Sequence, residues 1–71
     1  MTLSRKAMIS VLTAIQNSPE HWDRDILTFS ALLDDAELGK RIIDNFKVLG
    51  LESRQYALQA AHRAVNAQAA A

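Results

Sequence analysis

Residues 34–64 read DDAELGKRIIDNFKVLGLESRQYALQAAHRA, which describes one helix, a glycine stop and the beginning of another helix. Asp34 followed three positions later by Glu37 forms a capping box, a pairing that satisfies free backbone N–H groups at a helix start. Apolar residues then recur at the spacing of one helix face, at Leu38, Ile42, Phe46 and Leu49. Gly50 predicts the end of this helix, because glycine readily takes the left-handed conformation that closes many helices. The expected helix covers 35–49.

Two more helices are expected upstream of this stretch. The first covers 4–17, and its apolar stripe is formed by Met8, Val11, Leu12 and Ile15. The second covers 19–33, because Ser18 is a good N-cap and Pro19 is well tolerated in the first turn. Its apolar face is formed by Trp22, Ile26, Phe29 and Leu33. We therefore expect Trp22 and Phe29 to pack in the core.

A last helix is expected over 53–68. Ser53 is its predicted N-cap, and its many alanines favour helix strongly. Its expected inward stripe consists of Leu58, Ala61 and Val65.

The composition limits the fold class. The chain has 71 residues, 49% of them hydrophobic, with two glycines, one proline and no cysteine. These values predict a single all-α domain over 1–71, built from four short helices without disulfides. Two architectures fit: a helix-turn-helix-like core with a C-terminal helix, or an antiparallel four-helix bundle. They differ in how the second and third helices cross, which periodicity does not determine.

The charges exclude some roles. Eight basic and eight acidic residues balance, and six of the eight carboxylates lie between residues 20 and 37. Such a chain has no dominant basic field.

Its apolar runs are short, and it begins without a hydrophobic leader, so we expect a cytoplasmic protein that does not enter membranes.

The residue types required for catalysis are scarce. His21 and His62 are distant in sequence, cysteine is absent, and no glycine-rich phosphate loop or metal-ligand spacing occurs. We therefore expect no enzymatic activity, no catalytic residues, no cofactor and no metal.

Residues 49–61, LGLESRQYALQAA, resemble the junction into the last helix of LuxR-type (GerE-type) helix-turn-helix domains, which commonly show LGVxxRxxAVxxA. The matching positions are Leu49, Gly50, Arg54, Ala57, Leu58 and Ala61. The resemblance implies that Leu27 and Thr28 belong to a scanning helix, that residues 35–49 form the recognition helix, and that the last helix mediates dimerisation.

The same resemblance implies a DNA-binding transcriptional regulator. The candidate phosphate contacts are Lys40, Arg41, Lys47 and Arg54. However, the expected recognition helix begins with three carboxylates, on Asp34, Asp35 and Glu37, which repel phosphate. DNA binding is therefore the alternative hypothesis and not the favoured one.

The favoured hypothesis is a small regulatory module that binds another protein and modulates it. At 100° per residue, one side of the helix over 35–49 points away from its apolar stripe. That side carries Ala36, Gly39, Ile43 and Lys47, and an exposed Ile43 beside small residues suits a partner helix.

A second surface predicts a homodimer. It lies on the helix over 53–68 and consists of Tyr56, Ala60, Arg63 and Ala67. Its mostly small side chains let two copies approach closely.

Overall fold

The computed structural model describes residues 3–70. They form three α-helices, α1 (Arg5–Gln16), α2 (Asp35–Phe46) and α3 (Leu51–Ala70), and two short 3-10 turns, η1 (Pro19–His21) and η2 (Phe29–Leu32). Within residues 3–70 there is no β-strand, which confirms the all-α class. Across the same residues, no helix combines the length and apolar character needed to cross a membrane.

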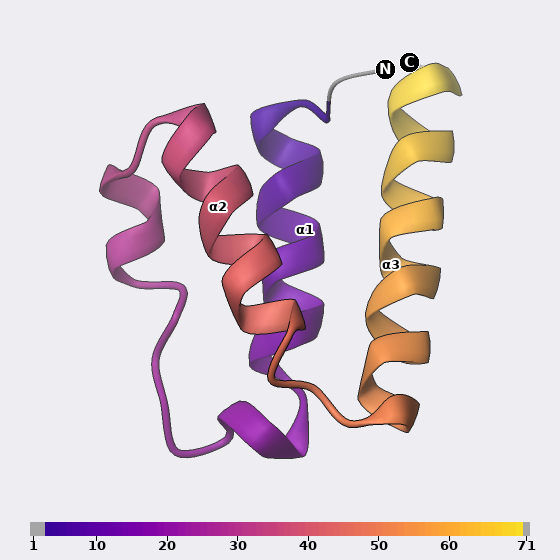
Figure 1. The fold of residues 1–71 in the computed structure, drawn as a ribbon. Helices are drawn as coiled ribbons and strands as arrows, with labels where there is room; N and C mark the ends of the chain where they lie inside the picture. The colour runs from indigo at the N-terminus through magenta and orange to yellow at the C-terminus, as the bar shows by residue number, and fades with distance from the viewer. Residues whose placement is uncertain (1–2, 71) are drawn as a thin grey trace.

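The central helix is α1, which lies between α2 and α3 and runs antiparallel to α3 (Figure 1). It packs against both neighbours, whereas α2 and α3 make few direct contacts with each other. Its predicted apolar stripe is buried, and Leu12 and Ile15 have no exposed surface. Ser4 caps the helix, because its hydroxyl oxygen accepts a hydrogen bond from the Ala7 N–H at 3.1 Å.

The second α-helix begins where the capping box predicts. The Asp34 carboxylate accepts a hydrogen bond from the Glu37 N–H at 2.8 Å. Leu38 is fully buried and anchors α2 on the core. The prediction that Gly50 adopts a left-handed conformation is wrong, since no described glycine has a positive φ. Its carbonyl instead accepts the Arg54 N–H at 2.9 Å, at the start of α3.

The prediction of an α-helix over 19–33 is wrong. Side chains there bond the backbone groups that an α-helix would use, which is how short polar residues compete with helix formation. The Asp25 carboxylate accepts hydrogen bonds from the N–H groups of Leu27 and Thr28, at 2.9 and 3.0 Å. The Gln16 side chain donates to the His21 carbonyl and accepts from the Ile26 N–H. The segment therefore forms η1, an extended stretch and η2.

These hydrogen bonds also affect the charge on Asp25. They hold the pKa of its carboxyl below the ordinary value, with the Thr28 side chain as the largest cause, followed by backbone N–H groups of Thr28 and Leu27. A lowered pKa in the folded state means that the turn is most stable above the unfolded-state pKa. That contribution is lost as the pH falls through the folded-state pKa.

Without the helix over 19–33, the expected core positions of two aromatic residues are also wrong. Trp22 is 85% exposed and Phe29 is 65% exposed. Ile26, between them, is buried, and Leu33 packs against the core. The loss of helical geometry explains the difference, because residues four apart no longer share one face.

The last helix begins two residues before its predicted start. Ser53 does not cap it, because its hydroxyl donates instead to the Glu20 carboxylate at 2.9 Å. The expected inward position of Leu58 is also wrong, since its side chain is 49% exposed. The helix packs on α1 through small residues: Ala57 is buried, and Ala61 and Ala64 are partly buried against the core.

Candidate protein-binding groove

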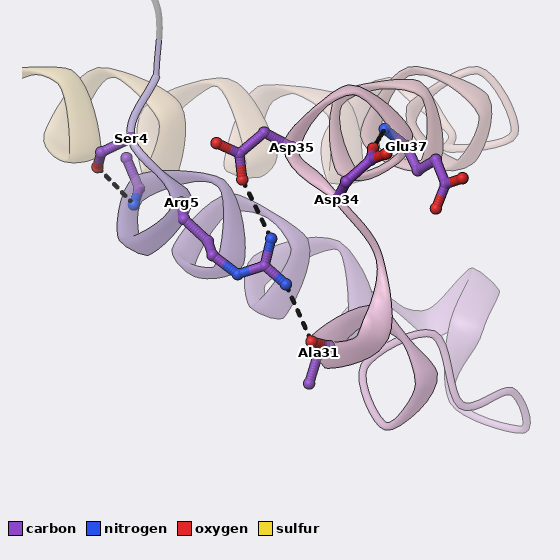
Figure 2. A network of polar contacts seen from close by, with 7 residues as sticks. Ser4, Arg5, Ala31, Asp34, Asp35 and Glu37 are labelled. Atoms are coloured by element: carbon purple, nitrogen blue, oxygen red, sulfur yellow. Dashed lines mark hydrogen bonds and ion pairs between the residues drawn. The ribbon is translucent and has the colours of Figure 1, made fainter.

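A polar network lies at the first turn of α2 (Figure 2). The Arg5 guanidinium donates to the Asp35 carboxylate at 3.1 Å and to the Ala31 carbonyl at 3.0 Å. One side chain of α1 therefore holds both the end of η2 and the start of α2. Within residues 3–70, this Arg5–Asp35 contact is the one ion pair.

An apolar groove of about 310 Å³ runs between α2 and α3, with α1 as its floor. Its lining consists of Leu3, Val11, Ile42, Ile43, Phe46, Lys47, Ala57, Leu58 and Ala61. Ile43 on the α2 wall is 57% exposed, and Leu58 on the α3 wall is 49% exposed. The groove exists because α2 and α3 each pack on α1 and stay apart from each other.

One cation, Lys47, lines this groove, and a second, Arg54, lies beside the end of α2. Arg54 donates to the Lys47 carbonyl at 2.8 Å, so it bonds a carbonyl group at the C-terminal end of α2. Its guanidinium carbon lies 5.6 Å from the centre of the Phe46 ring, within the range of a cation–π contact. Lys47 lines the groove and has no ion pair within the described residues. Among the residues that line the groove, the charged one is therefore Lys47.

The four predicted protein-binding residues share one side of α2, but they do not all line the groove. Ile43 and Lys47 belong to its wall, whereas Ala36 and Gly39 lie nearer the start of the helix. A Cβ added to Gly39 would meet no atom within 4 Å, so the space beside this glycine is open.

The predicted dimerisation face of α3 lies along its border with α1. Tyr56, Ala60 and Arg63 line a shallow depression of about 350 Å³ together with residues of α1. Ala67 lies in a neighbouring hollow that includes Ser4 and Ala7. Tyr56 is 54% exposed.

The four candidate phosphate contacts point to three different places. Lys40 and Arg41 line a depression that also contains the carboxylates of Glu37 and Asp44. Lys47 lies in the apolar groove, and Arg54 is bonded to the end of α2. These cations do not form one basic surface.

Of the two histidines, His21 is fully buried and His62 is exposed. The His21 ring nitrogens lie 3.1 Å from the Ser18 hydroxyl and 3.0 Å from the Asn45 side-chain oxygen. His21 therefore joins η1 to the ends of α1 and α2. Within residues 3–70, no cluster of three or more histidine, aspartate or glutamate side chains is placed to hold a metal ion.

Comparison with protein-family models, curated proteins and solved structures gives no match.

The sequence patterns did not predict that Leu58 and Phe46 line this groove. Leu58 and Phe46 were both assigned to the core, yet Leu58 forms the α3 wall and Phe46 is only partly buried. One signal was available: Ala57, Ala61 and Ala64 follow the i, i+4, i+7 spacing of a helix face made of small residues. That face packs on α1 and turns Leu58 toward the groove.

Proposed function

We propose that this protein is a small non-enzymatic regulatory module that binds a helix of another polypeptide chain in the groove between α2 and α3. The observation that carries the proposal is a groove whose facing walls expose Ile43 and Leu58. Large apolar side chains gain about 25 cal/mol for each Å² removed from water, so covering this groove favours association.

The arrangement of the helices supports a helical ligand. The floor of the groove is α1 and its walls are α2 and α3. These three helices leave room for a fourth helix to pack along the groove. A fourth amphipathic helix would bury its apolar face against the groove, in the manner of helix-in-groove recognition. Lys47 at the rim favours a ligand helix with a carboxylate beside its apolar face.

Replacing Ile43 by aspartate is expected to abolish partner binding while the domain stays folded. Ile43 is 57% exposed, so the change places a charge in the groove without opening a hole in the core. The tagged chain is expressed in cells, and the proteins that bind to it are captured from the cell extract. The captured proteins are identified by mass spectrometry, and folding is checked by circular dichroism.

The matched control is Leu32→Asp. Leu32 is 82% exposed on η2 and does not line the groove. This variant should capture the same proteins as the wild type. If Ile43→Asp also captures them at wild-type levels, the groove is not the binding surface.

DNA binding is the alternative function, and the scattered cations support it less. We expect little binding to a labelled random duplex, even at low ionic strength, in a fluorescence anisotropy titration. A log–log salt slope of about −3 or steeper would imply at least three phosphate contacts and would favour the alternative. In that event Lys40→Ala and Arg41→Ala should flatten the slope.

A further inference from the structure

We infer that Ser18 and His21 form a proton switch inside the fold. The Ser18 hydroxyl donates to the neutral His21 ring, and it turns to the Ile15 carbonyl when the ring is protonated. This buried histidine can therefore gain or lose a proton while both ring nitrogens keep their partners, and the junction of η1 with α1 and α2 stays intact. None of these three residues lines the groove, so the switch is independent of the proposed function.

The Asn45 amide fixes the hydrogen on one side of the ring. Its nitrogen donates to the Arg41 carbonyl at 2.8 Å, so its oxygen is the atom that faces His21. That oxygen lies 3.0 Å from Nε2 of the ring, and an amide oxygen only accepts hydrogen bonds. Nε2 therefore carries a hydrogen in both protonation states, and Nδ1 is the acceptor of the neutral ring.

The Ser18 hydroxyl lies between two acceptors. Its oxygen is 3.1 Å from Nδ1 of His21 and 2.6 Å from the Ile15 carbonyl oxygen. A hydroxyl donates one hydrogen, and its oxygen also accepts. The hydrogen goes to Nδ1 when that nitrogen is unprotonated. When Nδ1 is protonated, it donates to the hydroxyl, whose hydrogen turns to Ile15. The Ile15 carbonyl has a partner in either state, because it also accepts the Ser18 backbone N–H at 3.1 Å.

Direct contact with a charged side chain does not select either state. The His21 ring forms no ion pair within residues 3–70, and the last two turns of α1 carry no charged residue. Burial of the ring opposes protonation, and the two charge-assisted hydrogen bonds favour it. The charged residues on the surrounding elements are Glu20, Asp23 and Arg24 in and after η1, Arg41 and Asp44 on α2, and Glu52 at the start of α3.

The first test follows the ring nitrogens of His21 in the purified full chain by nuclear magnetic resonance, from about pH 8 to about pH 5. Nε2 should keep its hydrogen throughout, and Nδ1 should gain one while circular dichroism shows that the chain stays folded. The exposed His62 provides an internal comparison. A ring with its hydrogen on Nδ1 at the higher pH, or a ring that is protonated only as the chain unfolds, overturns the inference.

The second test is Ser18→Ala, which leaves Nδ1 without a partner. The unpaired N–H of a charged ring costs about twice as much as the unpaired nitrogen of a neutral ring. The folded variant therefore binds the proton less readily than the unfolded chain does, so its stability is greatest at high pH and falls as the pH decreases. Its loss in urea midpoint relative to the wild type should be about twice as large near pH 5 as near pH 8.

The matched control is Ser30→Ala. Ser30 is also buried, and its hydroxyl donates to the Ile26 carbonyl, so this hydrogen bond involves no titratable group. This variant should lose the same amount of stability at both pH values. A loss for Ser18→Ala that is equally independent of pH would overturn the switch. If Ser18→Ala does not fold, the resonance measurement on the wild type decides.

Discussion

Replacing His21 by alanine is expected to lower the free energy of unfolding by about 3 kcal/mol. The side chain is fully buried, and both ring nitrogens are hydrogen-bonded, to Ser18 and to Asn45. Alanine removes the ring, leaves a cavity and takes away the partner of the partly buried Asn45 side-chain oxygen. A chain of this size has a total stability of roughly 4–10 kcal/mol, so the loss is a large fraction. The measurement is urea denaturation followed by circular dichroism.

The neighbouring residue provides the control for this experiment. Trp22→Ala removes a larger side chain one position along, but Trp22 is 85% exposed. It should change the stability by no more than about 0.5 kcal/mol. Equal losses for the two variants would show that His21 does not join η1 to α2 in solution.

Leu38→Ala is expected to destabilise the protein by about 3 kcal/mol as well, because it removes a fully buried leucine and leaves a cavity. Leu38 is the one fully buried side chain of α2, so the position of this helix depends on it. The variant should unfold at a lower urea concentration with little change in the denaturant slope, which would indicate a change in stability alone. Ile43→Ala on the open side of α2 is the control and should have a much smaller effect.

The elements that could be predicted from the sequence are those fixed by nearby residues. The stripe of α1 and the Asp34 cap of α2 depend on spacings of three and four positions, and such patterns are visible in one sequence. The region over 19–33 depends on contacts with distant residues. Asn45 bonds His21 from 24 positions away, and the Gln16 side chain reaches across the loop to Ile26. No local pattern contains that information.

In the groove, too, one wall could be predicted from local sequence patterns and the other could not. Ile43 was predicted to be exposed, and it is, because the stripe of α2 determines which residues point away from the core. The α3 wall was not predicted, because alanine at so many positions gives the helix little contrast between its faces. Packing against α1 determines which alanines of α3 face that helix. With those alanines against α1, Leu58 lies in the groove.

The central place of α1 has a consequence for how the chain folds. Helical proteins often fold fast because neighbouring helices pair first. Here the contact from Arg5 to Asp35 spans 30 positions, and the contact from the Ser4 N–H to Gln68 spans 64. The helix formed from the first residues is completed by the helix formed from the last, and large loops must close before either is stabilised. Because the entropic cost of closing a loop rises with its length, we expect α1 to pair with α2 before it pairs with the end of α3.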